Sequence, residues 1–211
     1  MSLTLYVDNN YLSPWAMCAY VALVEKKLPF TIATIDIDAG EACQPVFSGL
    51  ALTARVPALV HDGFVLTEST AIVEYLDTVY PAPDWPALLP ADVRERARAR
   101  QIQAWVRSDL QALRQERDTT TVFGTPSTQP LSAAGRVDAD KLIAVAERLV
   151  SGPTLFERWC IADADLALML NRLIHSGDPV PARLRDYAAA QWARDALRSW
   201  REQQQQQHDA A

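Results

Sequence analysis

The first third of the chain combines two periods of hydrophobic residues. Leu3, Leu5 and Val7 alternate with more polar residues, and residues 33–37 repeat this alternation, which is typical of strands. Between them, residues 13–27 are apolar almost all round and end in charged residues, which indicates a buried helix. Because a helical crossover joins the two strands, the pattern predicts a parallel β-α-β unit.

A second pattern follows at residues 55–67. Two short apolar runs flank Asp62-Gly63, a dipeptide that favours the tight turn of a β-hairpin. Residues 69–80 then carry one apolar stripe with helical spacing. Residues 1–80 are therefore predicted to form an α/β domain, with an irregular segment between the second strand and the hairpin.

The rest of the chain shows no strand pattern. Residues 81–90 contain four prolines, which indicates a linker. Residues 91–211 are predicted to form an all-helical domain. Its expected helices are 92–117, 132–150, 161–176 and 182–202, and the glutamine-rich tail after them is expected to fray.

Composition limits the class of protein. The chain has 211 residues, 49% of them hydrophobic, and a formal net charge of −6. An acidic chain is not suited to bind nucleic acid through its overall field. The longest apolar run, residues 15–24, is too short to span a bilayer, and the start lacks a signal-peptide pattern. We therefore expect a cytoplasmic protein without a membrane or nucleic-acid partner.

Three widely spaced cysteines and dispersed histidines indicate neither a disulfide framework nor a metal site.

The dipeptide Ser13-Pro14 stands where the first predicted helix begins. Serine is a preferred N-cap and proline is preferred at the first helical position, so a structural role explains both residues. The same geometry suits chemistry, because a hydroxyl at a helix N-terminus can donate to an anion and the helix dipole favours negative charge there. A thiolate, the reactive form of a thiol, would be stabilised at this point. The local sequence leaves both interpretations open.

Two further features lie around the predicted hairpin. Val56-Pro57 opens its first strand; a trans bond is the commoner form, whereas a cis bond would turn the Val56 backbone outward to pair with an extended peptide. Ser69 is placed to cap the helix that follows, and Glu68 is placed to bind an ammonium group. Together, Glu68 and Ser69 suit the two charged ends of an amino acid.

In this order, on one β-α-β and β-β-α frame, these features resemble the cytosolic glutathione S-transferases. The resemblance covers the chain up to its tail and is closest to a bacterial subgroup with "RVP", "RARQIQAW" and "WCIADADLAL". It implies a thioredoxin-like N-terminal domain and an all-helical C-terminal domain. Serine-type members carry the activating serine at the position of Ser13, the cis-proline motif at Arg55–Leu59, and the pair that holds the γ-glutamyl end of glutathione at Glu68 and Ser69.

The resemblance implies a glutathione transferase, with glutathione as co-substrate and no metal. Ser13 would hold the glutathione sulfur as a thiolate, and Val56 and Pro57 would present backbone to the cysteinyl part. The thiolate would attack a small hydrophobic electrophile or a hydroperoxide. The expected co-substrate pocket is lined by Leu12, Trp105 and Ser108.

The chain departs from the family pattern at Ala42. Many members carry a His, Lys or Gln there, which reaches the glycine carboxylate of glutathione. Alanine cannot do this, and Gln44 and Arg55 are the nearest candidates to compensate.

Two alternatives stay open. One is a non-catalytic binding protein with the same fold, which Ala42 supports and the retention of Ser13, Glu68 and Ser69 opposes. The other is a glutathione-dependent isomerase like the maleylacetoacetate isomerases, which tend to show a Ser-Ser pair and a nearby arginine that "LSPWAMC" lacks. The resemblance also implies a homodimer in which the third and fourth helices pack against the partner.

Overall fold

The computed structural model describes residues 2–210, apart from the side chains of residues 208 and 210. Its internal contacts divide the chain into two compact units, Met1–Leu88 together with Ala196–Ala211, and Leu89–Asp195. No helix among the described residues is long and apolar enough to cross a membrane.

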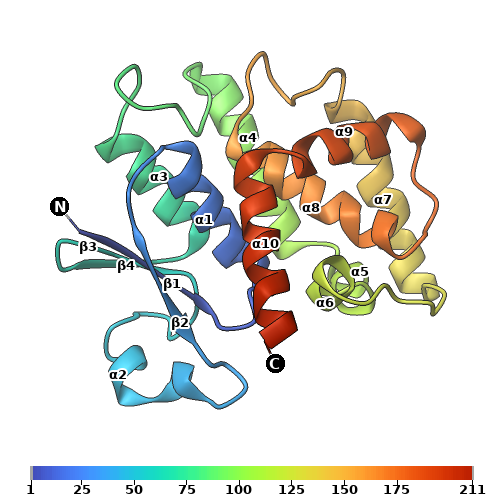
Figure 1. Cartoon of the computed structure of the whole chain (residues 1–211). Helices are drawn as coiled ribbons and strands as arrows, with labels where there is room; N and C mark the ends of the chain where they lie inside the picture. The colour runs from blue at the N-terminus through green and yellow to red at the C-terminus, as the bar shows by residue number, and fades with distance from the viewer. Residues whose placement is uncertain (1, 211) are drawn as a thin grey trace. The chain divides into compact units, whose positions relative to one another are not determined.

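The first unit is built on a four-stranded mixed sheet with the strand order β2-β1-β3-β4 (Figure 1). Strand β1 pairs in parallel with β2, and β3 pairs antiparallel with both β1 and β4. The predicted β-α-β unit and hairpin are both present. The strands are β1 (Leu3–Asp8), β2 (Thr31–Ile35), β3 (Ala58–His61) and β4 (Phe64–Thr67).

The hairpin turn follows directly from its sequence. Asp62 and Gly63 have φ of 47° and 88°. Positive φ at both central residues is what a type I′ turn requires, and an Asp-Gly pair tolerates it.

Helices cover both faces of this sheet. Helix α1 (Pro14–Glu25) and helix α3 (Ser69–Val79) lie on the same side (Figure 1). On the other face, the short helix η1 (Glu41–Cys43) and α2 (Pro45–Ser48) bring Phe47 to a small apolar cluster that includes Ile35 and the first residue of β3. The irregular segment of the sequence therefore serves as the second cover of the sheet.

Helix α1 is enclosed by protein, as its all-apolar sequence predicts. Its residues 16–23 are all buried. At its C-terminal end the fully buried Lys26 donates to Asp77 Oδ1 at 2.8 Å and to the carbonyl oxygen of Tyr80 at 2.6 Å. The backbone N–H of Leu88 also donates to Asp77 Oδ1, at 2.8 Å. One buried ion pair thus joins α1, the end of α3 and the proline-rich segment.

Helix α10 (Asp195–Ala210) corrects two expectations for the C-terminus. The predicted helix 182–202 is two helices, since α9 (Ala182–Trp192) ends before α10 begins. The glutamine-rich tail continues α10 to residue 210 instead of fraying, because glutamine is a good helix former and Trp200 anchors the helix.

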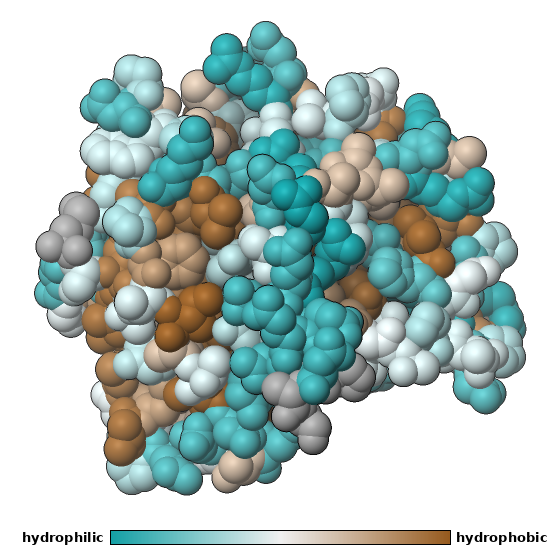
Figure 2. Space-filling view, in the orientation of Figure 1, coloured by the Kyte–Doolittle hydropathy of each residue, from teal (hydrophilic) through white to brown (hydrophobic). Residues whose placement is uncertain are grey.

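Helix α10 also groups with the first unit from Ala196 onward, whereas the sequence places all of residues 91–211 in the helical domain. Trp200 is fully buried there, with ring centroids 5.0 Å from Tyr11 and 5.3 Å from Tyr20. The hydroxyl of Tyr20 hydrogen-bonds Ser199 Oγ at 3.0 Å. In Figure 2, polar residues cover α10, whereas hydrophobic residues gather beside it over the part of the first unit that carries the sheet.

The second unit is all-helical, as predicted, but the long helix expected at 92–117 is interrupted. Leu110 has a left-handed backbone with φ of 58°, and Asp109 Oδ1 accepts the N–H of Leu110 at 2.8 Å. This local bond and the left-handed residue turn the chain between two helices. The helices besides α9 are α4 (Val93–Ser108), α5 (Gln111–Glu116), α6 (Thr119–Phe123), α7 (Ala133–Leu149) and α8 (Ile161–His175).

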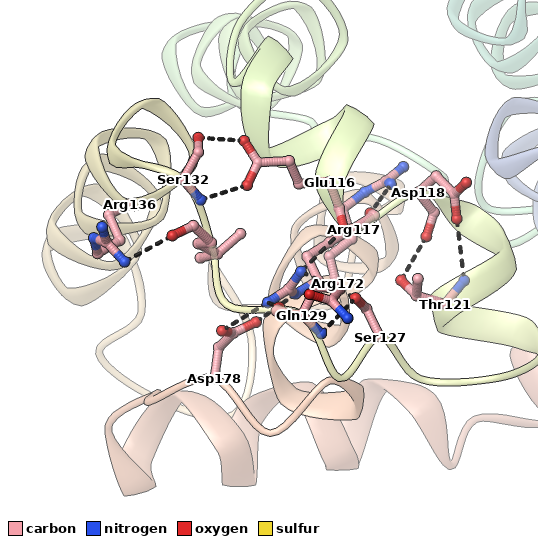
Figure 3. A network of polar contacts seen from close by, with 11 residues as sticks. Glu116, Arg117, Asp118, Thr121, Ser127, Gln129, Ser132, Arg136, Arg172 and Asp178 are labelled. Atoms are coloured by element: carbon pink, nitrogen blue, oxygen red, sulfur yellow. Dashed lines mark hydrogen bonds and ion pairs between the residues drawn. The ribbon is translucent and has the colours of Figure 1, made fainter.

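Buried polar groups hold the loops of this unit. Arg117 is 2% exposed and contacts both oxygens of Asp178, with Nε at 2.7 Å, and also donates to the carbonyl of Gln129 (Figure 3). Arg172 donates to the carbonyl of Arg117 at 2.6 Å. Burial lowers the pKa of Arg172 to about 10, with a smaller contribution from the charge of Arg114. These bonds satisfy backbone groups in the loops that join α5, α6 and α7.

Lys26→Ala should lower the free energy of unfolding by about 3–5 kcal/mol, because it leaves Asp77 buried without its cation. The neighbouring Lys27 is exposed, so Lys27→Ala is the matched control and should cost less than about 0.5 kcal/mol. Urea denaturation of the three proteins measures the difference. Equal losses in the two variants would contradict the importance given to the buried pair.

Candidate functional site

The strand register brings three predicted site segments to one end of the sheet. Tyr6 of β1 lies opposite Ala58 of β3, and Ala58 lies opposite Thr67 of β4. The turn from β1 to α1, the start of β3 and the start of α3 therefore meet at this end. They carry Ser13, Val56 and the Glu68-Ser69 pair, respectively.

Ser13 is the N-cap of α1 and is half-buried. Its Oγ accepts a hydrogen bond from the N–H of Ala16 at 3.2 Å, and Pro14 occupies the first helical position. The cap uses a lone pair of the hydroxyl, while its proton has no acceptor among the residues that the structure describes. The cap and an anion-binding role are thus compatible, since the proton can point at a ligand where the helix dipole favours negative charge.

The turn that carries Ser13 is held by a residue that the sequence patterns do not indicate. Asp8, the last residue of β1, is 4% exposed, and its two oxygens accept the N–H groups of Leu12 at 2.6 Å and Ser13 at 3.0 Å. Burial raises the pKa of Asp8, and the two backbone hydrogen bonds oppose that shift. An acidic residue that ends a buried strand just before a helix cap was the available signal.

Val56 lies just before β3, and its peptide bond to Pro57 is cis. The Val56 side chain packs against the apolar cluster of Ile35, Phe47 and Ala58. Its backbone N–H and C=O have no hydrogen-bond partner within residues 2–210, so both are available to an extended peptide.

Glu68 and Ser69 begin α3 in a different way from the one expected. Glu68, rather than Ser69, is the N-cap, and its carbonyl accepts the N–H of Ile72 at 2.9 Å. Glu68 is exposed. Its backbone has φ of 69° and ψ of 114°, a conformation that residues other than glycine rarely adopt. Its carboxylate forms no hydrogen bond or ion pair with any described residue. Ser69 is 4% exposed at the first helical position.

Ala42 lies in η1 and Gln44 lies directly before α2, whereas Arg55 lies in the loop before Val56. Ala42 is half-buried against the same apolar cluster that supports Val56, so packing explains why this position is apolar. Gln44 caps α2 through its backbone, and its side chain is exposed. Arg55 is exposed as well.

The residues expected in the co-substrate pocket have different surroundings. Leu12 is half-buried in the turn that carries Ser13. Trp105 lines a pocket of about 530 Å³ between α4 and α7 in the second unit, together with Arg98, Ile102 and Leu149. Ser108 is exposed, hydrogen-bonds the carbonyl of Ala104 at 2.9 Å and is not a lining residue of that pocket.

The mixed sheet, its helices on both faces and the all-helical second unit define a two-unit protein with a thioredoxin-like first unit. Two family profiles match this organisation: "Glutathione S-transferase, N-terminal domain" over residues 1–78 and "Glutathione S-transferase, C-terminal domain" over residues 92–202. The chain belongs to the glutathione S-transferase family, and the predicted fold is confirmed.

Relatives with known names agree with this assignment. Glutathione S-transferase theta-3 of Mus musculus is 29% identical over 209 residues, which cover 96% of this chain and 81% of that protein. Maleylacetoacetate isomerase of Pseudomonas aeruginosa is 41% identical over 96 residues, 44% of each chain. A solved glutathione transferase homologue from Burkholderia, with bound glutathione, is 44% identical with a TM-score of 0.83, covering 98% of this chain and all of that one.

The backbone of Glu68 gives a prediction about stability. Glu68→Gly should be more stable than Glu68→Ala by about 1 kcal/mol, because only glycine removes the Cβ that disfavours this conformation. Urea denaturation of both variants measures the difference. A Glu68→Ala protein as stable as Glu68→Gly would show that the site holds no such strain.

Proposed function

We propose that the protein is a serine-type glutathione transferase that binds glutathione at this end of the sheet. The observation that carries the proposal is the half-buried hydroxyl of Ser13 at the N-terminus of α1, with a proton free for a ligand. Ser13 donates that proton to the sulfur of glutathione. The hydrogen bond and the helix dipole both favour the thiolate over the thiol. The glutathione bound in the Burkholderia homologue supports the choice of ligand.

The rest of the tripeptide is held by groups with matching chemistry. The Val56 backbone pairs with the cysteinyl residue, and Pro57 follows it into β3. Glu68 takes the α-ammonium group of the γ-glutamyl end, and Ser69 at the start of α3 takes its α-carboxylate. Gln44 and Arg55 are the groups proposed to reach the glycine carboxylate in place of Ala42.

The bound thiolate then acts as a nucleophile. In conjugation it attacks an electrophilic carbon and forms an S–C bond. In a substitution the leaving group departs with its bonding electrons; in an addition the π-electron pair moves to a neighbouring atom, which then takes a proton from solvent. With a hydroperoxide it attacks the terminal oxygen, forming an S–O bond while the O–O bond breaks. The alkoxide that leaves takes up a proton from solvent, equal to the one that the thiol released on ionising, and becomes the alcohol. The resulting sulfenic acid condenses with a second glutathione thiol to give the disulfide and water. Leu12, Trp105 and Ser108 are the proposed co-substrate contacts.

Calorimetric titration with reduced glutathione should show binding to the wild type that Glu68→Ala weakens at least about tenfold, because the ammonium group loses its anion. Glu157→Ala, the same change at an exposed glutamate outside the three site segments, is the control and should bind like the wild type. Absence of binding at millimolar glutathione would favour the non-catalytic alternative and protein partners.

Ser13→Ala should lower kcat about tenfold or more. Each unit by which the pKa of the bound thiol rises lowers the fraction of thiolate about tenfold. The affinity for glutathione should change much less, since the remaining contacts are intact. Turnover is measured with an aromatic halide and with an organic hydroperoxide. Full turnover in Ser13→Ala would exclude the serine-type assignment.

A glutathione-dependent isomerase is the second candidate. The observation in its favour is the similarity to the maleylacetoacetate isomerase of Pseudomonas aeruginosa. In that reaction the thiolate adds reversibly to a double bond, and no leaving group departs. An assay of cis–trans isomerisation in the presence of glutathione, run beside the conjugation assay, separates the two candidates.

We further propose a cytoplasmic homodimer that uses α3 and α4, on which Val79 and Val93 are exposed by 38% and 76%. Sedimentation should give twice the 23.4 kDa of one chain. Val79→Glu with Val93→Glu should shift it toward the monomer, because a buried unpaired charge is costly. Val46→Glu on α2, also exposed, is the control. A wild-type monomer would refute the dimer.

A further inference from the structure

The turn between β1 and α1 depends on one buried carboxylate. Tyr11 donates its N–H to the carbonyl of Asp8 at 3.1 Å, and Asn9 donates to the carbonyl of Ile35 at 3.0 Å. The next two N–H groups, those of Leu12 and Ser13, have no backbone acceptor within residues 2–210 and instead share the two oxygens of the Asp8 side chain. Without Asp8, two half-buried donors would lose their partners.

The preceding residue is fixed independently. Tyr11 is 4% exposed, has φ of 54° and packs edge-on against Trp200, with ring centroids 5.0 Å apart. The turn is therefore anchored up to Tyr11 by backbone bonds and aromatic packing. The carboxylate of Asp8 decides the placement of the two residues beyond it.

The geometry also limits what Asp8 can do. Each of its two oxygens accepts a backbone N–H group, and neither accepts a hydrogen bond from the hydroxyl of Ser13. Asp8 is therefore not arranged as a general base for that hydroxyl. A carboxylate beside the α1 N-terminus also opposes a bound thiolate by charge repulsion. A direct electrostatic role and a positioning role thus predict opposite effects when Asp8 is replaced.

We propose that Asp8 is a positioning residue for the transferase reaction: its carboxylate clamps the Leu12 and Ser13 backbone and so aims the Ser13 hydroxyl at the glutathione sulfur. The proposal rests on the proposed function of Ser13. The ionised carboxylate suits this task, because hydrogen bonds from N–H groups to a charged acceptor are shorter and stronger than those to a neutral one. The clamp acts on glutathione through Ser13 and touches no reacting atom.

The test titrates the ultraviolet absorbance of bound glutathione thiolate against pH, in the wild type and in Asp8→Asn. Asparagine keeps one acceptor oxygen but turns an amide N–H₂ toward the second donor. We expect the pKa of the bound thiol to rise by about one unit and kcat to fall about tenfold, with little change in the Kd of glutathione. A lowered or unchanged thiol pKa would overturn the proposal, because loss of the charge alone lowers it.

Asp38→Asn is the matched control for charge. The charge of Asp38 contributes to the raised pKa of Asp8. Its carboxylate accepts a hydrogen bond from Asn10 but not from Leu12 or Ser13. We expect no rise in the thiol pKa in this variant. An equal rise in both variants would overturn the proposal.

The Ser13→Ala background separates this proposal from the one it rests on. If Asp8 acts through Ser13, Asp8→Asn adds no further rise in the thiol pKa to Ser13→Ala. If Ser13→Ala alone leaves the thiol pKa unchanged, both proposals fail. If Ser13→Ala raises it and Asp8→Asn does not, only the Asp8 proposal fails. Circular dichroism shows whether Asp8→Asn folds. If it does not, Asp8→Glu replaces it, because glutamate keeps the charge but displaces the two oxygens. An unchanged thiol pKa in Asp8→Glu would also overturn the proposal.

Discussion

The position of β3 between β1 and β4 is the constraint on which the candidate site depends. Its antiparallel register sets Tyr6, Ala58 and Thr67 side by side, so the turns that follow β1 and β4 meet the segment that precedes β3. A slip of one residue would turn the side chains of β3 to the opposite face of the sheet, which is buried on both sides. The apolar alternation of β1 and the tight Asp62-Gly63 turn both resist such a slip, and the same packing that holds the register therefore gathers the site.

Helix α1 shows how polar contacts at the ends of a buried helix define its place. An apolar helix covered on all sides has no amphipathic pattern to fix its rotation or its height on the sheet. At its N-terminus, Asp8 and Ser13 bind backbone N–H groups, and at its C-terminus Lys26 binds Asp77. These directional bonds supply the specificity that general burial lacks. Because the N-terminal contact includes the proposed thiolate donor, the folding and the chemistry of the first unit share one set of hydrogen bonds.

In the second unit, too, hydrogen bonds from polar side chains to the backbone fix the place of a helix and of a loop. Asp163 is fully buried and accepts the N–H groups of Cys160 and Leu155 and the hydroxyl of Tyr187. Burial raises the pKa of Asp163, and these hydrogen bonds oppose the shift. One carboxylate thereby caps α8 and fixes the loop before it. Side-chain bonds to the backbone hold loops that have no sheet or helix partner, which explains why Arg117 and Asp163 are buried in this unit.

Residue spacing and turn chemistry are enough to predict the local elements, namely the β-α-β unit, the hairpin, the buried α1 and the Ser13 cap. The candidate residues Ser13, Val56, Glu68 and Ser69 were also found this way, because their types suit the ends of elements. Tertiary structure decided the interruption at Leu110, the return of α10 to the first unit, the positive φ of Glu68 and the orientation of Asp8. The packing of α10 depends on contacts between distant segments, and the conformations at Leu110 and Asp8 depend on bonds from a side chain to the backbone. Local periodicity carries no information about such partners.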